Sequence, residues 1–335
     1  MLTPSYALTS TERVLPRLAL DFTAGVLDPR VTITRALNTA TRINSSGLLE
    51  VVNANLPRFD FNPTTLVSRG LLIEEARQNL FLNSLIDGTN LTTQSVTLTA
   101  AAHTLSFYGT GSVVISGGHT ATLAGTGNYP TRTTLTFTPT AGSSTFTVTG
   151  EVKFAQIELG AFATSFIPTA GTSVQRNADV ATMTSTNFTS WFNASEGAFS
   201  ATYSRIAIKR YSRVFAASNV AESDQITLIS GLQADGRENG NVQVASVQNI
   251  LYPGNTPAAG QVTQFCLSYK TGSSAASLNA STVSTSSAAF ANPAPTQFNI
   301  GSIVASGQYL NGHVQKVMYW PQDLTDAEVR AFSKL

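Results

Sequence analysis

The chain has 335 residues, of which 42% are hydrophobic and only 12% are charged, and its formal net charge is +1. This length has room for two or three domains. A net charge near zero gives no field that would attract nucleic acid, so we do not expect a nucleic-acid-binding protein. The neutral surface that Ser, Thr and Asn would form suits neutral sugars or a packed protein assembly.

The single cysteine and the N-terminal residues argue against two further classes. Cys266 has no partner within the chain for a disulfide. The strand-like sequence around it predicts a buried small side chain rather than a nucleophile. The first residues lack the basic and then apolar pattern of a secretory signal, and no apolar run is long enough to span a bilayer. We therefore expect a chain without membrane insertion.

Residues 1–65 predict a basic arm with little core of its own. Leu18, Leu20 and Phe22 alternate with other residues as in a strand with one apolar face. Six arginines, Arg13 and Arg17 among them, make the segment basic. Because short strands so far apart make a poor independent core, we expect the arm to gain order on a neighbouring domain or subunit. The alternative is that it forms outer strands of the first sandwich.

Residues 70–82 mark a change of character, since they are apolar at both ends and charged at Glu74, Glu75 and Arg77. The pattern predicts a strand or connector that is buried at its ends and wet at its centre. We interpret it as a hinge between the arm and a displayed body, and an ordinary connector inside one domain is the alternative. Adjacent side chains of a strand point to opposite faces, so Glu74 and Glu75 are not a catalytic pair.

From residue 83 to about 170 the sequence predicts short strands separated by Gly and Pro turns. The strands are expected at residues 95–99, 104–108, 112–116, 121–123, 133–138, 144–149 and 152–159. Such strands at regular spacing indicate an antiparallel β-sandwich in which neighbours in sequence pair. A linker is expected at 166–179, where Pro and Gly flank polar residues.

Residues 180–335 predict a second all-β unit with a short helix at its end. Strands are expected at residues 197–204, 213–217, 225–229 and 313–320. The dipeptides Asn239-Gly240 and Asn311-Gly312 predict tight hairpin turns. Thr325 and Glu328 have the spacing of a capping box, which predicts a helix at 326–333. The predicted fold class is therefore all-β: an N-terminal arm, two β-sandwich or jelly-roll domains and a short C-terminal helix.

Three groups of segments resemble known proteins. Residues 18–22, 31–36 and 38–42, followed by 57–61 and 70–80, resemble the opening of many tailed-phage virion proteins. Residues 156–169 resemble the closing strand of a carbohydrate-binding-module-like sandwich in the same proteins. Residues 312–332 resemble the end of a concanavalin A-like, or laminin G-like, jelly roll.

The resemblance to phage head-fibre, head-decoration and tail-fibre proteins implies three domains. These are an attachment arm at 1–65, a carbohydrate-binding-module-like sandwich at 66–170 and a concanavalin A-like jelly roll at 171–335. The implied function is that of a non-enzymatic capsid head fibre or decoration protein on the virion surface, made in the host cytoplasm. The alternatives are a receptor-binding tail fibre that recognises host polysaccharide and a glycan hydrolase.

The same resemblance implies the partners and the attachment residues. The expected partners are the major capsid protein or another virion protein, further copies in a homotrimer, and a host-surface glycan. Attachment to the particle would use Arg13, Arg17, Leu18, Leu20 and Phe22.

Candidate chemistry in the second unit is sparse. Retaining hydrolases with concanavalin-like folds resemble one another in a Glu-x-Asp-x-Glu strand. Here Glu222 and Asp224 match the first two acids, but Ile226 replaces the third, so no catalytic residue is assigned. The three histidines are isolated, and neither a metal site nor a cofactor is assigned. Calcium stays open, because oxygen donors occur in predicted loops at Glu222, Asp224, Asp235, Glu238 and Asn239.

Sugar binding requires aromatic faces beside amide or carboxylate groups. Tyr211 and Tyr252 lie near predicted loop tips and are the candidate ligand-binding residues. The alternative for each is a place in the core, where most large aromatic residues of a sandwich lie.

Overall fold

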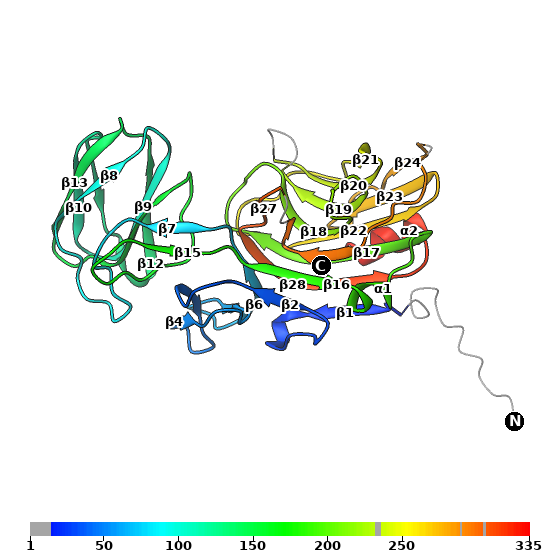
Figure 1. Cartoon of the computed structure of the whole chain (residues 1–335), viewed down its shortest axis with the longest axis horizontal. Helices are drawn as coiled ribbons and strands as arrows, with labels where there is room; N and C mark the ends of the chain where they lie inside the picture. Colours follow the sequence, from blue (N-terminus) through cyan, green and yellow to red (C-terminus); the bar gives the residue numbers. More distant parts are fainter. Residues whose placement is uncertain (1–14, 232–235, 289, 304–305) are drawn as a thin grey trace, which may run out of the picture. The chain divides into compact units, whose positions relative to one another are not determined.

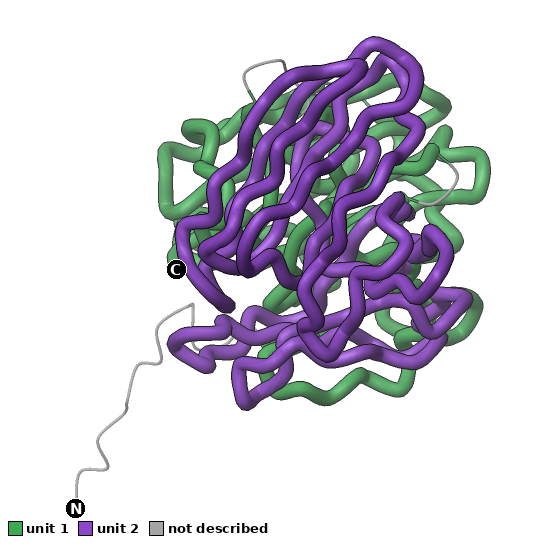
Figure 2. Tube along the Cα trace, turned by 90° about the vertical axis from the view of Figure 1, so that its left-hand side faces the viewer, with its two compact units in different colours: residues 1–32, 180–335 green, residues 33–179 purple. Residues whose placement is uncertain are grey.

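The computed structural model describes residues 15–231, 236–288, 290–303 and 306–335 (Figure 1). Strands hold 48% of the chain and helices 4%, which confirms the all-β prediction. The chain divides into two compact units, residues 33–179 and residues 1–32 with 180–335 (Figure 2). These bounds differ from the predicted divisions after 65 and 170, because residues 18–21 pair with the last strand of the chain and residues 33–65 belong with the sandwich.

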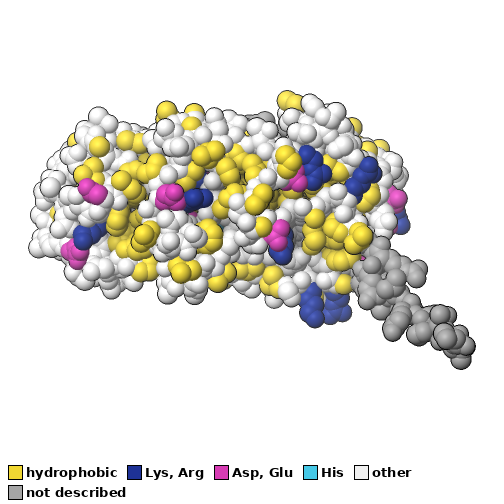
Figure 3. All heavy atoms as spheres, turned by 90° about the horizontal axis from the view of Figure 1, so that it is seen from below, with side chains coloured by type: hydrophobic (Ala, Val, Ile, Leu, Met, Phe, Trp, Pro, Cys, Tyr) yellow, Lys and Arg dark blue, Asp and Glu magenta, His cyan; other side chains and the backbone are white. Residues whose placement is uncertain are grey.

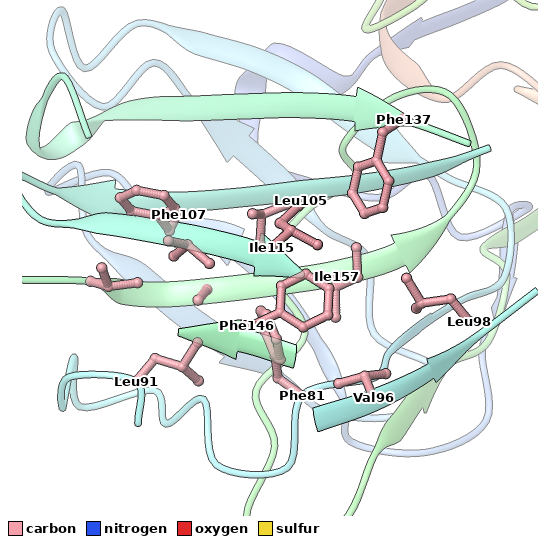
Figure 4. Packing of buried hydrophobic residues seen from close by; sticks show 13 residues of the cluster. Phe81, Leu91, Val96, Leu98, Leu105, Phe107, Ile115, Phe137, Phe146 and Ile157 are labelled. Carbon is pink, nitrogen blue, oxygen red and sulfur yellow. The ribbon is translucent and has the colours of Figure 1, made fainter. Parts of the chain in front are cut away.

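The sandwich in residues 33–179 consists of two antiparallel sheets, with the orders β11-β10-β13-β8 and β12-β9-β14. Its strands are β8 (Gln94–Leu98), β9 (His103–Gly109), β10 (Ser112–Gly117), β11 (Ala121–Ala124), β12 (Gly127–Phe137), β13 (Gly142–Thr149) and β14 (Lys153–Leu159). Alternate side chains of both sheets point into one core (Figure 4). In this core the ring of Phe81 packs edge-on against that of Phe146, with 5.2 Å between the ring centres. All seven predicted strands are present.

The predicted pairing of neighbours in sequence is wrong for most of this sandwich. Only β10 and β11 pair in that way, whereas β9 pairs with β12 and β14, and β13 pairs with β8 and β10. The chain crosses repeatedly between the two sheets, so that each strand presents its apolar side chains to the shared core.

The other strands of this unit form three antiparallel pairs. They are β3 (Ala40–Ile43) with β4 (Leu49–Val52), β5 (Phe59–Phe61) with β6 (Ser68–Ile73), and β7 (Arg77–Asn79) with β15 (Val174–Arg176), preceded by β2 (Thr32–Thr34). Three- and four-residue ladders of this kind hold little stability alone. Buried charges connect them to one another.

Five buried residues form an ion cluster: Arg35, Arg58, Glu74, Arg176 and Asp179. Asp179 pairs with Arg35 at 2.8 Å and with Arg58, and Glu74 pairs with Arg58 at 2.8 Å and with Arg176. Burial alone would favour a neutral Glu74. Attraction by Arg176 and Arg58 outweighs that effect and holds the pKa of Glu74 well below its usual range. The cluster joins segments that are up to 144 residues apart in sequence.

The ion cluster overturns two expectations about connectors. Glu74, at the centre of residues 70–82, is fully buried rather than wet, because two arginines pair with it and Ser165 donates to it through its amide and its hydroxyl. Residues 166–179 are not a free linker. Phe166 begins this segment as a core residue at 1% exposure, and Asp179 ends it in the ion cluster.

The unit of residues 1–32 and 180–335 also has two sheets. Within the unit, one sheet has the order β24-β23-β22-β17-β28 with β1 beside β28, and the other has the order β16-β25-β18-β19-β20-β21. The strands of the first are β1 (Leu18–Asp21), β17 (Glu196–Arg205), β22 (Thr263–Lys270), β23 (Ser273–Leu278), β24 (Ser284–Ser286) and β28 (Gly312–Trp320). Those of the second are β16 (Val180–Thr184), β18 (Ser212–Ser218), β19 (Gln225–Ser230), β20 (Glu238–Val244), β21 (Val247–Leu251) and β25 (Gln297–Ile300).

The remaining elements of this unit are short. They are η2 (Phe22–Ala24), α1 (Thr186–Thr189), the paired β26 (Ser302–Ile303) and β27 (Gln308–Tyr309), and α2 (Asp326–Phe332). The capping box of α2 is present as predicted, since the Thr325 side chain accepts from the Glu328 amide and the Glu328 carboxylate accepts from the Thr325 amide. Among the described residues, no helix is long and apolar enough to cross a membrane.

Aromatic rings fill the space between the two sheets of this unit. The ring of Phe199 on β17 stacks on the rings of Phe215 and Phe298, with 4.9 Å and 5.5 Å between the ring centres. Trp191 packs edge-on against Phe298. Cys266 is fully buried as predicted, and burial raises the pKa of its thiol well above the usual range. The core therefore lies between β17 and its neighbours on one side and β18 and β25 on the other.

Figure 3 shows a face on which charged side chains are few and several basic ones lie beside an acidic one. Partly exposed ion pairs of the described chain include Arg30 with Asp28, at 2.7 Å, and Arg42 with Glu50, at 3.1 Å. This face offers neutral side chains rather than a patch of one charge.

Candidate functional site

The outer face of the β18–β19–β20 sheet carries a set of polar side chains that do not face solvent. Strand alternation directs Phe215, Leu228 and Val242 into the core, so their neighbours point to the opposite face. The register sets these neighbours in rows across the strands, such as Asn299, Ala216, Thr227 and Asn241. We call this set the amide face: Arg213, Ser218, Gln225, Thr227, Asn239, Asn241, Gln243 and Asn299.

Every side chain of the amide face is buried, with at most 6% of its surface exposed. Eight of their polar atoms have no hydrogen-bond partner in the described part of the chain. They are Arg213 Nε, Ser218 Oγ, Gln225 Oε1, Thr227 Oγ1, Asn239 Oδ1, both amide atoms of Asn241, and Asn299 Nδ2. A buried polar group without a partner costs about 1–3 kcal/mol. Each such atom calls for an explanation, which for eight atoms on one face is either buried water or a polar ligand.

The turn between β18 and β19 closes over one end of the amide face. The side-chain amides of Gln225 and Gln243 both donate to the carbonyl oxygen of Glu222. The Oε1 atom of Glu222 is itself buried and has no partner among the described residues. Burial lowers the pKa of Arg213 to about 10, and the carboxylate of Glu222 partly offsets this effect. The amide face thus contains the positively charged Arg213, and the turn at one end of it contains the negatively charged Glu222.

The two tyrosines predicted to bind ligand lie at the other end of the same sheet, where β18 begins and β21 ends. Tyr211 is 39% exposed, and the guanidinium of Arg210 lies 5.0 Å from its ring centre. Tyr252 is half-buried and directly follows β21. The structure brings both residues to the edge of the amide face, and their contact with a ligand stays a prediction.

The acids considered for catalysis are not placed as a catalytic pair in the described chain. Glu222 and Asp224 lie in the turn before β19 rather than on a strand. The Asp224 carboxylate accepts from the amides of Ala245 at 2.7 Å and Ala294 at 3.3 Å, which fixes neighbouring loops. Glu238 lies on β20 but faces the core. The described residues contain no group of three His, Cys, Asp or Glu that could hold a metal ion, and Asp235, one of the proposed calcium donors, lies outside them.

Glu238 gives this unit a pH dependence. Its carboxylate pairs with Arg205 at 3.0 Å and accepts from Ser230 at 2.9 Å. Burial nevertheless raises its pKa to about 7, above that of an unfolded glutamate. Its stabilising contribution is therefore full below about pH 4.5 and is lost as the pH rises through about 7.

We expect the free energy of unfolding of the wild type to fall by on the order of 3 kcal/mol relative to that of Glu238→Gln between pH 5 and 8. Chemical denaturation of both proteins across that range measures it, and a difference that stays constant with pH contradicts the assignment.

Residues 33–179 contain a groove of about 450 Å³ lined by Glu75, Arg77, Gln78 and Gln175 and their apolar neighbours. Arg77 pairs with Glu75 at 2.6 Å, and its guanidinium lies 4.7 Å from the ring centre of Phe162. The charges of Arg77 and Glu75 in this groove therefore neutralise each other. The groove is a weaker candidate for ligand binding than the amide face.

The predicted attachment residues take part in the fold of the chain. Leu18, Leu20 and Phe22 are at most 3% exposed and lie on β1 and η2 beside β28, so they have no free apolar surface to offer a particle. Arg17 donates to the carbonyl oxygen of Ser190 at 2.8 Å. Arg13 lies outside the described residues. Attachment through the arm stays a prediction for its other residues.

The predicted hairpin turn at Asn239-Gly240 is wrong, and this error concealed the polar alternation of the amide face in the sequence. The dipeptide Asn239-Gly240 lies inside β20 rather than in a hairpin turn. A side chain at Gly240 would meet Leu267 of the opposite sheet at 2.9 Å, so this glycine allows close sheet packing. The signal that could have found the face is the alternation of Asn239, Asn241 and Gln243 along this strand.

No protein-family model matches the chain, and no curated protein matches it. Solved structures resemble parts of it. A heptameric SAP-like pentraxin from Limulus polyphemus is 14% identical, with a TM-score of 0.34 over 42% of this chain and 70% of that one. A sialidase CBM40 from Ruminococcus gnavus, bound to α2,3-sialyllactose, is 11% identical, with a TM-score of 0.37 over 43% and 84%. A NanB sialidase mutant from Streptococcus pneumoniae is 12% identical, with a TM-score of 0.37 over 46% and 26%. Each likeness covers less than half of this chain, and we base no function on it.

Proposed function

We propose that the protein binds a glycan at the amide face and is not an enzyme. The observation that supports this is the set of buried, unpartnered polar atoms on four neighbouring strands, β25, β18, β19 and β20. They include donors, acceptors and hydroxyls, and sugar hydroxyls both donate and accept. Of the described carboxylates nearby, Asp224 accepts from two loop amides and Glu238 pairs with Arg205 in the core. Glu222 is therefore left without a second free acid to flank a glycosidic bond.

A glycan array probed with the full chain tests this proposal. We expect specific hits for the wild type and none for Asn241→Leu, which fills the centre of the amide face with an apolar side chain of similar size. Gln78→Leu is the matched control, because it changes the groove in residues 33–179 and is expected to keep the hits. Unchanged hits for Asn241→Leu, or a silent array for the wild type, contradict the proposal. Release of reducing sugar from a bound glycan contradicts the non-enzymatic part.

We further propose that this glycan-binding protein is displayed on a phage particle, as a capsid head fibre or decoration protein in a homotrimer. The support is the resemblance of residues 57–61, 70–80 and 156–169 to virion proteins. Arg58, Glu74 and Ser165, one from each of these segments, meet at the ion cluster. Electron microscopy of particles labelled with an antibody to the chain is expected to show it on the capsid. Label on the tail supports the tail-fibre alternative, and particles without label contradict display.

A further inference from the structure

We infer that the groove in residues 33–179 is a strand-addition site, which binds residues 5–11 of a second copy of this chain in an extended form. The inference rests on the proposed assembly of several copies and is independent of glycan binding at the amide face. Three features of the groove carry it: an open strand edge, an uncovered end of the apolar core, and side chains without net charge.

The outer edge of β14 has backbone groups that point away from its neighbour β9. The amide of Gly160 donates to the carbonyl oxygen of Ala102, on the β9 side. Successive residues of an antiparallel strand direct their backbone groups to opposite edges, so the N–H and C=O of Leu159 point away from β9. The carbonyl of Ile157, two residues earlier, points the same way, since it accepts from the amide of Leu80 at 2.9 Å.

The outward N–H and C=O groups of Leu159 have no partner in the described part of the chain. The strand β7 ends close to this edge, but no ladder joins β7 to β14 among the described residues. The side chain of Leu159 is 52% exposed and lines the groove, so the chain itself does not cover this edge. An exposed strand edge is a template for pairing with another chain. The backbone of an extended peptide supplies the matching donor and acceptor.

The apolar core of the sandwich ends uncovered in the same groove. Strand alternation places Ile157 and Leu159 on one face of β14. Ile157 is fully buried in the core, whereas Leu159 continues the row into the groove. Leu80 packs against the core and also lines the groove. An apolar side chain of an added strand would therefore cover Leu80 and Leu159 and extend the core by one row.

The charges of the groove are already neutralised. Arg77 pairs with Glu75 at 2.6 Å, and the other polar side chains of the lining, Gln78 and Gln175, carry no charge. An uncharged segment can therefore enter without leaving a charge unpaired.

Residues 5–11, which lie outside the described residues, have a sequence that matches this groove. They contain no charged residue, no glycine and no proline, so each can donate a backbone hydrogen bond to an added ladder. Tyr6 and Leu8 alternate with Ala7 and Thr9, which places the two large side chains on one face of an extended segment. A contact between this segment and the groove of the next copy is head-to-tail, and such contacts close into rings such as a trimer.

Cysteine crosslinking between full-length chains tests the inference. Leu8→Cys and Leu159→Cys are co-expressed as separate chains with tags of different length and then oxidised mildly. The natural Cys266 is fully buried and does not compete. We expect the mixed disulfide to exceed that of Leu8→Cys with Leu48→Cys by about tenfold or more, because a bound segment raises the local thiol concentration. Leu48 is the matched control, since it is 59% exposed in the same unit. A parallel series with Tyr6→Cys covers the other large residue of the segment.

Sedimentation of the full chain over a range of concentrations gives a second measurement. Leu159→Pro removes an N–H that has no partner in the described chain, so the ladder with β9 is kept while the open edge is blocked. Leu8→Asp brings an unpaired charge into the groove. We expect each variant to weaken self-association by about tenfold or more, and the control Leu48→Asp to leave it unchanged. Thermal unfolding confirms that each variant is folded, and Leu8→Asp keeps the test available if Leu159→Pro is not.

The outcomes separate this inference from the proposed function. If the copies associate but neither Leu159→Pro nor Leu8→Asp weakens the association, the assembly stands and the strand-addition site is overturned. Equal crosslinking of Leu8→Cys to Leu48→Cys and to Leu159→Cys also overturns it. A disulfide that forms only within a chain carrying both Leu8→Cys and Leu159→Cys overturns the contact between copies. A wild type that stays a single chain at every concentration overturns both the assembly and the inference, whereas the glycan array bears on neither.

Discussion

Replacement of Glu74 by glutamine is expected to lower the free energy of unfolding of residues 33–179 by about 3–5 kcal/mol, because it leaves the buried Arg58 and Arg176 without their shared negative partner. An amide fits the same space but carries no charge. Chemical denaturation of the full chain, followed by a probe within this unit, measures the loss. Glu74 holds together segments that have short ladders and little core of their own, so we expect the whole unit to weaken.

Glu50→Gln is the matched control for this prediction. Glu50 pairs with Arg42 at 3.1 Å, but its side chain is 43% exposed, and such pairs contribute about 0–1 kcal/mol. Equal stability losses for the two variants would show that the ion cluster does not hold the unit together. Because the pKa of Glu74 is lowered by folding, its contribution is present above about pH 4.5 and is lost as the pH falls through the folded pKa. The stability difference between wild type and Glu74→Gln should therefore shrink in strong acid.

Thr227→Val is expected to do the reverse: to stabilise the protein by about 1 kcal/mol or more while weakening glycan binding. The Thr227 hydroxyl is buried in the amide face and has no partner in the described chain, so its removal relieves a desolvation penalty. Valine has nearly the same shape and fits a strand equally well. A site that holds polar groups ready for a ligand gives up stability in the unbound protein. Thermal unfolding and calorimetric titration of the same sample measure the two effects.

Thr202→Val is the control for this second prediction. Thr202 is also buried on a strand, but its hydroxyl donates to the side-chain oxygen of Gln264. Removal of that hydroxyl leaves the oxygen unsatisfied and should destabilise the protein by about 1–3 kcal/mol without a change in glycan affinity. If Thr227→Val destabilises as much as Thr202→Val, the amide face is part of an ordinary core network.

Local patterns predicted the elements of this fold well. Alternation located the strands of the first sandwich, and the spacing of Thr325 and Glu328 located the last helix, because each depends on residues that are close in sequence. The pairing of β9 with β12 and β14 was not predictable in this way, since the sequence of a strand does not state which sheet it joins. Crossovers between two sheets are decided by packing of the shared core.

The ion cluster and the amide face were also beyond prediction from local sequence patterns. Glu74 was predicted to be wet because it lies in a charged stretch, but its partners Arg58 and Arg176 are 16 and 102 residues away. Only the folded chain brings them together. Asn239 was assigned to a turn because the Asn-Gly dipeptide favours one, and the sheet overrode that local preference. The polar alternation of Asn239, Asn241 and Gln243 was visible, but nothing in it says that the face is buried.

A crystal structure of the full chain with a bound oligosaccharide tests the central claim most directly. The amide face is predicted to hold the ligand, with sugar hydroxyls about 2.7–3.2 Å from the side-chain amides of Asn241 and Asn299 and from the hydroxyl of Thr227. Density for the sugar in the groove beside Arg77 and Gln78, with the amide face unchanged, would contradict it.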